Sequence, residues 1–558
     1  MSKYEYVITP PEAGKNTIPL WQDALAAVKS AGGGKIIFAP GRYDFFPEGC
    51  SQRYCYFSNN DEGVKTIALD IVGVNDLSVE GCGAEFCFYG RVSPLVAVHC
   101  RNLRVAGFTV DFADSFVSDA DLAEESDGIA WFRIGGQHRF ENGKLIFTGD
   151  FYDNMSGKLL FYPFDTEKNE FVWDAHAVNL SNSQLLEKDG LIGFRHDFSG
   201  FPTRAFIIKH ELRLCPGMVF DNCTDVDLTG VSVHHAAGMG VLFQQSDNIN
   251  ISKLQVVPRG RRASASDDAL HLTECRGNIH ISDSIFAGTL DDSINIHSVY
   301  RPLKERIPGG HFYYLDTGHY QQSGLAGARP GDTLELVKND TGKPYGKLKL
   351  TNAVLLNKAI TKVEFDPAEL PEEFVPGDCA RVLESANAEV IVENCRFSTV
   401  NGRGILAAGM KKAIIRNNFF HTSGAAIFVS GDTVFWYEAG PVGEMEIYGN
   451  TFDHCCYRRW GATREIVSVF PEISTAVPGF SYHGRICVRN NVFRSPFRML
   501  VSMKNTAHAE VVDNRFVIDD SRVYMPGSES GYFFADMTPE QVAFMDCPEV
   551  VVKNNDLL

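Results

Sequence analysis

Residues 226–256 read VDLTGVSVHHAAGMGVLFQQSDNINISKLQV and contain the pattern that organises most of the chain. Apolar residues stand at Val226, Leu228, Val231 and Val233, and the same spacing begins again 23 residues later. Alternating apolar residues on both sides of a two-residue corner are typical of short strands that join at bends. A repeat of this length that stacks on itself predicts a solenoid of strands.

The same spacing recurs along the chain. Further copies begin at Leu103, Ile249, Ile279, Val390, Ala413, Met445, Ile486, Ala509 and Val550. The sixth position of the last five copies is asparagine, at Asn418, Asn450, Asn491, Asn514 and Asn555. Asparagine tolerates left-handed backbone and bonds to its neighbours at a turn, so we expect these residues to stack as a hydrogen-bonded ladder. Because parallel connections are right-handed, the predicted fold is an all-β, right-handed parallel β-helix.

Other segments do not follow the repeat. Residues 16–30 predict a helix with Ile18, Trp21, Leu25 and Val28 on one face, suited to cap the N-terminal end of the stack. Two segments carry antiparallel signatures and predict inserted, barrel-like β domains. The expected units are 1–112 (cap and first rungs), 113–218 (first insertion), 219–298 (rungs with the active site), 299–385 (second insertion) and 386–558 (C-terminal rungs).

The candidate active site lies in residues 263–297, which read ASASDDALHLTECRGNIHISDSIFAGTLDDSINIH. Two acidic doublets end in Asp268 and begin with Asp291, 23 residues apart, and each is followed closely by a histidine, His271 and His297. On neighbouring rungs the doublets would lie about 4.8 Å apart along the stack. Clustered carboxylates oppose one another's ionisation, so one should hold a proton near neutral pH. A protonated and an ionised carboxyl together are the groups that glycoside hydrolysis requires.

The composition of the chain limits the classes of partner that it can bind. The 558-residue chain has a formal net charge of −18, which disfavours nucleic acid and anionic membranes as partners. No apolar run is long enough for a transmembrane helix, and the N-terminus lacks the pattern of a signal peptide. The 14 cysteines include no CxxC pair. We therefore expect no metal and no cofactor, and mostly buried free thiols, which favour a reducing compartment such as the cytoplasm over a secreted mature form.

Other polar residues are candidates for sugar binding. Arg403 could bond sugar hydroxyls or an aspartate, with a surface position as the alternative. Trp436 suits the apolar face of a sugar ring and Glu438 its hydroxyls, although the tryptophan could equally anchor its loop. Glu472 has weaker support of the same kind. His271 and His297 either touch substrate, tune an aspartate or are buried core residues.

Several motifs resemble glycoside hydrolase family 110. They are FSNNDEG at 57–63, SDDALHLTECRG at 266–277, LDDSINIH at 290–297, WYEAGP at 436–441 and FPE at 470–472. The resemblance covers nearly the whole chain. It implies a right-handed parallel β-helix with inserted β-barrels and an inverting, metal-independent α-1,3-galactosidase.

The resemblance also implies roles for the acidic residues. Asp268, Asp291 and Asp292 match the family's catalytic carboxylates, with Asp291 as the general acid and the other two holding the attacking water. An inverting site of this kind separates acid and base by roughly 6.5–9.5 Å. The chain departs from the family pattern at Ala269, where glycine is expected, and at Ala439, where serine is common, which puts fine specificity in doubt.

The predicted function is exo-acting, inverting hydrolysis of terminal α-1,3-linked galactose from an oligo- or polysaccharide. The alternatives are a polygalacturonase-like hydrolase, a polysaccharide lyase and a non-catalytic glycan-binding β-helix. The residues leave open which glycan carries the galactose: a branched blood-group-B-type structure, a linear α-1,3-galactoside or an algal galactan. They also leave open the oligomeric state, with a homodimer as one alternative.

Overall fold

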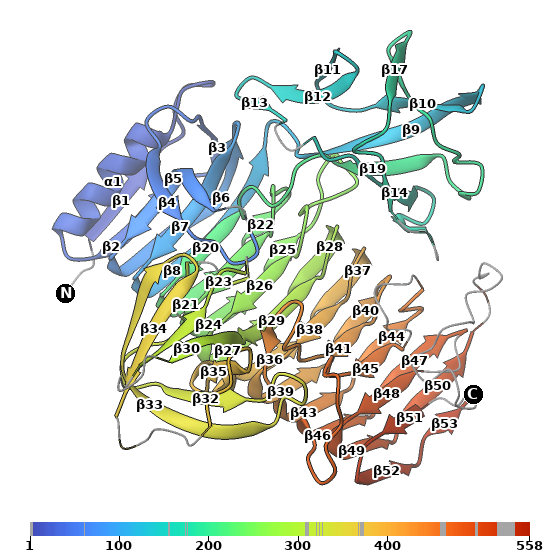
Figure 1. The fold of residues 1–558 in the computed structure, drawn as a ribbon. Coiled ribbons are helices and arrows are strands. Elements are labelled where there is room, and N and C mark those ends of the chain that lie inside the picture. The colour runs from blue at the N-terminus through green and yellow to red at the C-terminus, as the bar shows by residue number, and fades with distance from the viewer. Residues whose placement is uncertain are drawn as a thin grey trace.

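The computed structural model describes residues 4–60, 62–154, 157–172, 175, 177–306, 312–319, 321–322, 324–325, 327–366, 368, 373–457, 465–496, 500–519, 521 and 542–558. Its body is a stack of short parallel strands, joined at bends, that runs from the N-terminal to the C-terminal end of the chain (Figure 1). The predicted right-handed parallel β-helix is confirmed.

The larger sheet contains 23 strands, two from most rungs. They are β1 (Tyr4–Ile8), β2 (Gly34–Phe38), β3 (Gly41–Phe45), β6 (Asn75–Phe88), β8 (Arg101–Phe112), β21 (Thr224–Thr229), β22 (Ser232–Val233), β24 (Asp247–Ser252), β25 (Gln255–Val256), β27 (Arg276–Ser282), β28 (Ile285–Thr289), β36 (Glu389–Glu393), β37 (Arg396–Val400), β39 (Met410–Arg416), β40 (Phe419–His421), β43 (Val442–Tyr448), β44 (Thr451–Asp453), β46 (His483–Arg489), β47 (Val492–Ser495), β49 (Thr506–Val512), β50 (Arg515–Ile518), β52 (Glu549–Lys553) and β53 (Asp556–Leu557).

The second sheet of the β-helix contributes the third strand of each rung. Its 13 strands are β4 (Ser51–Cys55), β5 (Gly63–Val72), β7 (Val92–Val98), β20 (Met218–Asp221), β23 (Val241–Gln244), β26 (Leu270–Thr273), β29 (Ile294–Val299), β38 (Ile405–Ala407), β41 (Ile427–Val429), β42 (Glu438–Ala439), β45 (Val467–Val469), β48 (Val501–Lys504) and β51 (Val542–Met545). All neighbours are parallel except β4 with β5 and β42 with β29.

The register of the stack reproduces the sequence repeat. Val226 pairs with Ile249, and the first residue of each predicted copy pairs with the first residue of the next, from Leu103 through to Val550. The apolar residues of the pattern point inward and form one continuous core. The core includes a column of stacked rings, Phe286, Phe397, Phe420, Phe452 and Phe493, whose centroids are 4.5–5.3 Å apart.

The asparagines form the predicted ladder in the corner between the two strands of the larger sheet. Asn491 Oδ1 accepts bonds from both the backbone N–H and the side-chain Nδ2 of Asn450, at 2.9 and 3.0 Å. Asn418, Asn514 and Asn555 continue this pattern on their own rungs. One detail of the prediction is wrong: the left-handed residue is the one before each ladder asparagine, such as Asn417 (φ 56°) and Asn490 (φ 54°). The ladder residue is thereby free to turn its amide inward.

A helix covers the N-terminal end of the stack (Figure 1). It is α1 (Ile18–Ser30), and it buries Ile18, Trp21, Ala24, Leu25 and Val28. Asn16 Oδ1 accepts the N–H of Ile18 at 3.2 Å, and Pro19 lies in the first turn, where its missing N–H costs nothing. The helix contacts β1, β2 and β5, so it shields the first rungs from water as predicted.

The first insertion is an antiparallel sheet on one side of the stack (Figure 1), and it contacts the rungs at points such as His421 Nε2, 2.7 Å from Glu170 Oε2. Its strand order, β15-β14-β19-β9-β10-β18-β17 with β16 beside β14, runs without closure among the described residues. The strands are β9 (Val117–Ser126), β10 (Ile129–Ile134), β14 (Leu160–Asp165), β15 (Glu170–Phe171), β16 (Val178–Asn179), β17 (Leu185–Lys188), β18 (Leu191–Phe194) and β19 (Ala205–Lys209). A smaller sheet joins β11 (His138–Glu141), β12 (Lys144–Gly149) and β13 (Tyr152–Asp153).

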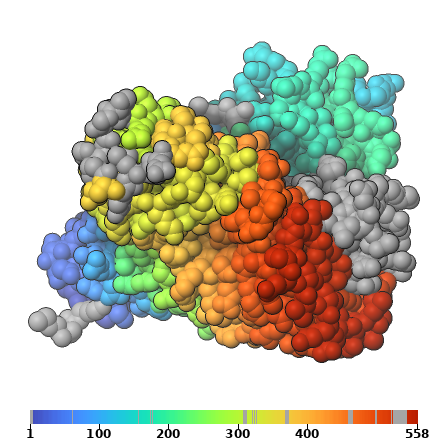
Figure 2. Space-filling view, turned by 60° about the horizontal axis from the view of Figure 1, so that its bottom comes forward, coloured from blue at the N-terminus to red at the C-terminus, as the bar shows by residue number. Residues whose placement is uncertain are grey.

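The second insertion is a closed antiparallel barrel packed against the β-helix (Figure 2). Buried or partly buried ion pairs join the two: Arg276 holds both carboxylate oxygens of Asp332, at 2.8 and 2.7 Å, and Arg329 holds Asp247 at 2.6 Å. The barrel strands, in the order β30-β31-β34-β33-β32-β35, are β30 (Arg301–Arg306), β31 (Phe312–Asp316), β32 (Thr333–Val337), β33 (Pro344–Asn357), β34 (Ile360–Phe365) and β35 (Cys379–Val382). A short 3-10 turn, η2 (Ser385–Asn387), leads back to the stack.

Two general properties follow from the described coordinates. No helix in the described part of the chain combines the length and the apolar character needed to cross a bilayer. All 14 cysteines are free thiols, and ten of them are buried.

Candidate active site

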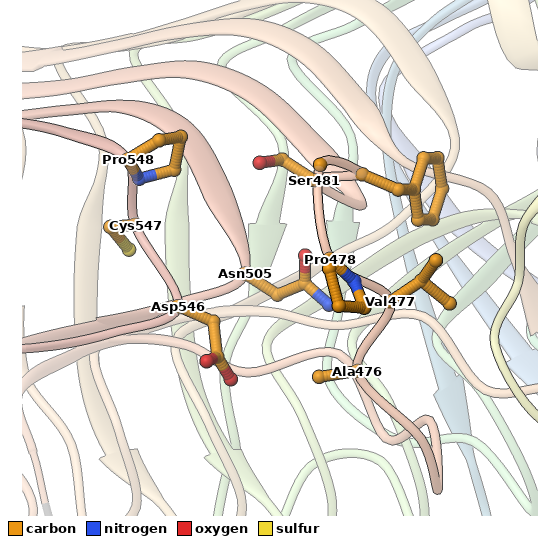
Figure 3. Close-up of a pocket in the computed structure, with 10 residues that line it drawn as sticks. Ala476, Val477, Pro478, Ser481, Asn505, Asp546, Cys547 and Pro548 are labelled. Atoms are coloured by element: carbon orange, nitrogen blue, oxygen red, sulfur yellow. The ribbon is translucent and has the colours of Figure 1, made fainter.

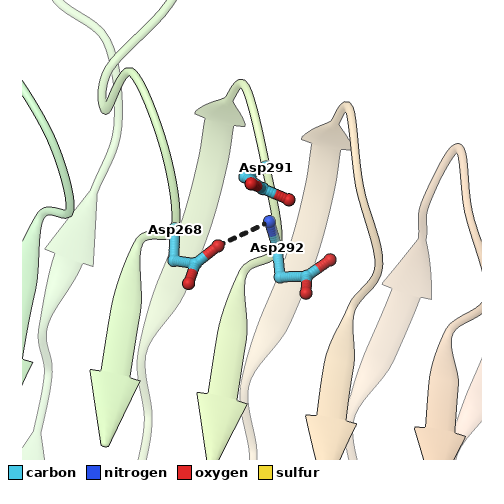
Figure 4. A group of neighbouring side chains, drawn as sticks. All are labelled: Asp268, Asp291 and Asp292. Atoms are coloured by element: carbon cyan, nitrogen blue, oxygen red, sulfur yellow. Dashed lines mark hydrogen bonds between the residues drawn. The ribbon is translucent and has the colours of Figure 1, made fainter. Parts of the chain in front are cut away.

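The three acidic residues meet at the turns that lead into two neighbouring strands, β26 and β29 (Figure 4). Leu270 pairs with Ile294, so Asp268 is aligned with Asp292 rather than with Asp291, and the spacing across this turn is 24 residues instead of the 23 of the repeat. The backbone N–H of Asp292 donates to Asp268 Oδ1 at 3.1 Å. Asp268 and Asp292 therefore lie side by side, and Asp291 lies above Asp292 in the view of Figure 4.

The three carboxylates are close together but unequally accessible. Each contributes an oxygen that lies within 4.8 Å of the oxygens of the other two. Asp268 and Asp292 are buried, whereas the side chain of Asp291 is 21% exposed. Asp291 is therefore the member of the trio that solvent or a substrate can reach.

Burial and mutual repulsion raise the pKa values of all three carboxyls. Burial, followed by the charge of Asp291, raises the pKa of Asp268 well above its ordinary range. Burial and the charge of Asp292 raise the pKa of Asp291 to about 6, and burial raises that of Asp292 to about 6 against the opposing charge of Arg403. Near neutral pH the trio therefore holds fewer than three negative charges.

Arg403 binds one aspartate of the doublet, which the sequence presented as one of its two alternatives. Its backbone N–H and its Nε both donate to Asp292 Oδ1, at 2.7 and 2.9 Å. The guanidinium also lies 5.3 Å from the ring centre of Phe428. These contacts hold Asp292 in a single orientation and favour its ionised form.

Arg213 binds the other aspartate of the doublet, Asp291, and no sequence motif indicated this residue. It follows the last strand of the first insertion and donates from Nη2 to Asp291 Oδ2 at 3.2 Å. Its Nε donates to Asp267 at 2.8 Å, and its backbone has φ 30°, a rare value for a residue with a side chain. No repeat pattern surrounds it, so only the return of the insertion to the stack could have indicated its place.

Asp267 does not belong to the trio, but Arg213 links it to Asp291 because the same guanidinium bonds to both carboxylates. Lys209 Nζ donates to Asp267 at 2.7 Å, in addition to Arg213. Burial alone would raise the pKa of Asp267, but Lys209 and Arg213 outweigh it, and the pKa is lowered. Asp267 thus anchors the first insertion beside the site.

His271 and His297 lie beneath the trio and out of solvent. His271 Nδ1 is 2.8 Å from Asp268 Oδ2, and His271 Nε2 is 3.0 Å from His297 Nε2. Burial lowers the pKa of each histidine to about 4, so both are neutral near pH 7. The structure brings His271 to Asp268 and His297 to His271, and it leaves both little surface for a sugar.

Glu438 enters the site on a strand outside the repeat. It belongs to β42, where it pairs with Val299 of β29. Its Oε1 accepts bonds from Asn295 Nδ2 at 3.0 Å and from Gln321 Nε2 at 3.2 Å. Asn295 and Gln321 are thus two amides that sequence reasoning did not single out, and the second belongs to the segment that joins two barrel strands.

Trp436 and Glu472 stand at the edge of this group. Trp436 is 37% exposed on a loop whose backbone N–H groups bond to the carboxylate of Asp432. Glu472 reaches solvent, yet surrounding protein and the charge of Asp432 raise its pKa to about 7. Arg403 and Glu438 are near enough to Glu472 to influence its pKa.

The trio also offers three oxygens that a divalent cation could use. The cationic side chains of Arg213 and Arg403 already bond to two of these carboxylates, and both would oppose a further positive charge. We therefore do not assign these residues as metal ligands.

A separate hollow lies near the C-terminal end of the stack (Figure 3). It measures about 600 Å³ and is lined by residues 476–481 together with Asn505, Asp546, Cys547 and Pro548. Asp546 is the single carboxylate among its lining residues. The hollow lacks the paired acid and base of the trio and is not a second site of that kind.

The fold and the site together define a β-helical protein with a carboxylate centre of glycoside hydrolase type. The family described as "GLAA-B beta-barrel domain II" matches residues 315–380, within the barrel insertion. The chain is 26% identical to "Alpha-1,3-galactosidase B" of Bacteroides thetaiotaomicron over 98% of its own length and 89% of that protein. It is 28% identical to "Alpha-1,3-galactosidase A" of Shewanella woodyi over 91% of its own length and 84% of that protein.

Among solved structures, an exopolygalacturonase from Thermotoga maritima is a distant likeness. It has 10% sequence identity and a TM-score of 0.40, covering 93% of this chain and 88% of its own. The agreement with the two galactosidases along nearly the whole sequence confirms the resemblance to glycoside hydrolase family 110.

Proposed function

We propose that the protein is an exo-acting α-1,3-galactosidase that releases terminal galactose from oligo- or polysaccharides with inversion. The observation that carries the proposal is the trio of Asp268, Asp291 and Asp292, whose oxygens approach within 4.8 Å. The trio occurs in a chain that matches named α-1,3-galactosidases along most of its length. Closely placed carboxyls with raised pKa values supply the acid and the base that the reaction needs.

Asp291 is assigned as the general acid. It is the accessible member of the trio, and a pKa of about 6 leaves a substantial protonated fraction at mildly acidic pH. As the bond between galactose C1 and the glycosidic oxygen breaks, the carboxyl of Asp291 gives its proton to that oxygen.

Asp268 and Asp292 are assigned to the attacking water. Two oxygens up to about 4.8 Å apart can both accept from one water at ordinary hydrogen-bond lengths. The water oxygen bonds to C1, one of its protons passes to a carboxylate, and the other stays on the new hydroxyl. The nearest oxygens of the trio lie within 4.8 Å, closer than the roughly 6.5–9.5 Å typical of inverting pairs. Inversion places the water against Asp268 and Asp292, on the face of C1 opposite the oxygen that Asp291 protonates.

The sugar contacts follow from the polar groups around the trio. Glu438 and Arg403 bond to galactose hydroxyls, and Trp436 packs against an apolar sugar face at the rim. Glu472, with a pKa of about 7, donates or accepts a hydrogen bond according to pH. His271 and His297 are excluded from this set because both are buried beneath Asp268.

Proton NMR of a fresh digest of Gal-α-1,3-Gal tests the proposal in one measurement. We expect free β-galactose first, followed by mutarotation. Early α-galactose would mean retention of configuration, and an unsaturated, ultraviolet-absorbing product would mean a lyase. No cleavage of this disaccharide, with cleavage of a galacturonide, would favour the polygalacturonase-like alternative.

We further propose that the chain forms a homodimer through its C-terminal edge. The outermost strand β52 pairs only with β49 among the described residues, and its Val550 and Val552 are 43% and 47% exposed. Unpaired edges with apolar side chains favour association. Sedimentation of Val552→Lys, compared with the wild type, should show a loss of the dimer; an unchanged mass would contradict this contact.

We also propose that the protein works in a reducing compartment. Support comes from its 14 free cysteines, of which the great majority are buried or half-buried. Counting free thiols after isolation under non-reducing conditions tests this: fewer than 14 reactive thiols in the unfolded protein would indicate oxidation.

A further inference from the structure

A chain of hydrogen bonds leads from the catalytic trio into the protein. Asp268 Oδ2 lies 2.8 Å from His271 Nδ1, His271 Nε2 lies 3.0 Å from His297 Nε2, and His297 Nδ1 lies 2.7 Å from the carbonyl oxygen of Ser298. All four residues are buried. Each contact therefore has to be satisfied by protein groups alone.

The Ser298 end of this series of hydrogen bonds determines which nitrogen atoms carry hydrogen. The carbonyl oxygen of Ser298 can only accept, so His297 Nδ1 must carry a hydrogen. A neutral His297 then has a bare Nε2, which must accept from Nε2–H of His271. A neutral His271 in turn has a bare Nδ1. The remaining contact, to Asp268, needs a proton of its own.

That remaining proton belongs to the pair formed by Asp268 and His271. It resides either on the carboxyl, which then donates to Nδ1, or on the imidazole, which then donates to the carboxylate; in both arrangements the pair has no net charge. Burial disfavours the ion pair and favours the neutral carboxylic acid. The raised pKa of Asp268 and the lowered pKa of His271 point the same way.

The charged groups packed around the chain do not reverse this preference. Asp267, Asp291 and Asp292 oppose ionisation of Asp268, and Arg213 favours it. Glu438 and Glu274 favour protonation of the histidines, which Arg213 opposes at His271. Arg403 bonds to Asp292 through Nε and not to Asp268.

We propose that the buried histidines His271 and His297 lock one proton onto Asp268, so that Asp268 positions the attacking water as a neutral acid and Asp292 alone serves as the base. This inference rests on the proposed function and assigns roles that the resemblance leaves shared. His271 and His297 are positioning residues, because they act through Asp268 and not on the sugar.

The proton balance of the reaction then has a single route. Asp291 gives its proton to the departing glycosidic oxygen, and the attacking water gives one proton to the ionised Asp292. The proton of Asp268 stays in its bond to His271 throughout. Since Asp268 Oδ2 donates and Oδ1 accepts from the backbone, this carboxyl has lone pairs left to orient water and no capacity to take its proton.

The first experiment reads the protons directly, without substrate. Infrared difference spectra between the wild type and Asp268→Asn near pH 7 should contain the carbonyl stretch of a protonated, buried carboxyl. Nitrogen-15 NMR should show His271 protonated at Nε2 and His297 at Nδ1. An ionised carboxylate at Asp268, or a hydrogen on His271 Nδ1, would overturn the proposal.

The second experiment breaks the chain at its inner link. In His297→Leu nothing accepts from His271 Nε2, so the hydrogen of His271 moves to Nδ1, the proton of Asp268 is released to solvent, and His271 donates to the ionised Asp268. One more negative charge beside Asp291 and Asp292 should move both limbs of the pH–rate profile upward by about one pH unit. The carbonyl band of Asp268 should disappear in the same variant.

Matched variants separate this effect from a general loss of packing. In His297→Gln the amide oxygen can accept from His271, so the band and the profile should stay close to wild type. His235→Asn removes another buried histidine, whose Nδ1 bonds to the Ser264 carbonyl at 2.7 Å, and should cost stability without moving the profile. Equal profile shifts in all three variants would contradict the proposal.

Different results would contradict the proposed function and the proton locked on Asp268. If the disaccharide is not cleaved but the band and the histidine protons are as described, the proposed function is wrong and the locked proton stands. If the disaccharide is cleaved and the band is absent, the function stands and the locked proton is wrong.

Discussion

The asparagine ladder of the C-terminal rungs and the aspartates of the central rungs are both stacks of like side chains on neighbouring strands. An amide offers a donor and an acceptor, so Asn450 and Asn491 satisfy each other at 3.0 Å. Ionised carboxylates offer acceptors only, so Asp268 and Asp292 need other groups to lie side by side: a backbone N–H, an arginine and the proton proposed on Asp268. The same stacking geometry thus stabilises the fold in one place and raises pKa values in the other.

The largest expected effect comes from removing the acid. Asp291→Asn should lower kcat on Gal-α-1,3-Gal by about 10²–10⁴-fold, because no proton reaches the leaving oxygen. A nitrophenyl galactoside, with a better leaving group, should lose much less. The control is Asp225→Asn, an exposed turn aspartate bonded to Asn248, which should behave as wild type in both assays. Full activity of Asp291→Asn on the disaccharide would show that another group is the acid.

Converting the ladder into an acidic stack should be the next largest effect. Asn491→Ala leaves buried donors of Asn450 without a partner and should cost about 2–4 kcal/mol in denaturant unfolding. Asn491→Asp should cost more as the pH rises, because a carboxylate would face the Ile447 carbonyl and Asn514 Oδ1. Asn250→Ala, at an exposed bond to Asp227, should change stability by less than about 0.5 kcal/mol.

Activity of the folded ladder variants on the disaccharide should be unchanged. If Asn491→Asp instead had the same stability at pH 5 and pH 8, ionisation of a carboxyl in the ladder would not destabilise the fold, contrary to the expectation.

A smaller effect should appear in the pH dependence of stability. The pKa of Asp291 is about 6 in the folded protein, above its ordinary value near 3.8, so the folded state binds more protons than the unfolded state between these values. The free energy of unfolding should therefore fall as the pH rises from about 4 to 6. Asp291→Asn should lack about 1–2 kcal/mol of this fall, after allowance for solvent access. Parallel curves for wild type and variant would place the raised pKa elsewhere.

The smallest expected effect is none. Exhaustive treatment with a chelator should leave kcat on the disaccharide unchanged, because Arg213 and Arg403 supply the positive charge beside the trio. A loss of activity that added calcium or magnesium restores would show that a cation contributes, and the ladder and the trio would then differ in a further way.

Much of the β-helix could be predicted because the spacing of apolar residues within each repeat determines how the rungs stack. The first residues of all copies from Leu103 to Val550 pair in order, and the ladder asparagines follow from the same phase. The insertion of Arg213 beside Asp291 could not be predicted, because that contact spans 78 residues and belongs to no repeat. The alignment of Asp268 with Asp292 could not be predicted either. A single extra residue in the turn lengthens the spacing between paired residues from 23 to 24.

The protonation of the site depends on which atom of each hydrogen bond donates, and residue spacing in the sequence does not determine this. The short distance from Asp268 to His271 in the sequence indicated contact, but only the carbonyl of Ser298 at the far end decides which nitrogen carries hydrogen. The pairing of Glu438 with Asn295 and Gln321 likewise joins three separate segments.

The rung-by-rung register has a consequence for how the molecule comes apart. Each rung touches only its neighbours, so unfolding can begin at the outer strand β52 and proceed inward rung by rung, without first disturbing β26 and β29. Heating should therefore melt the C-terminal rungs before the catalytic turns, and signals from Val550 should be lost while galactose is still being released.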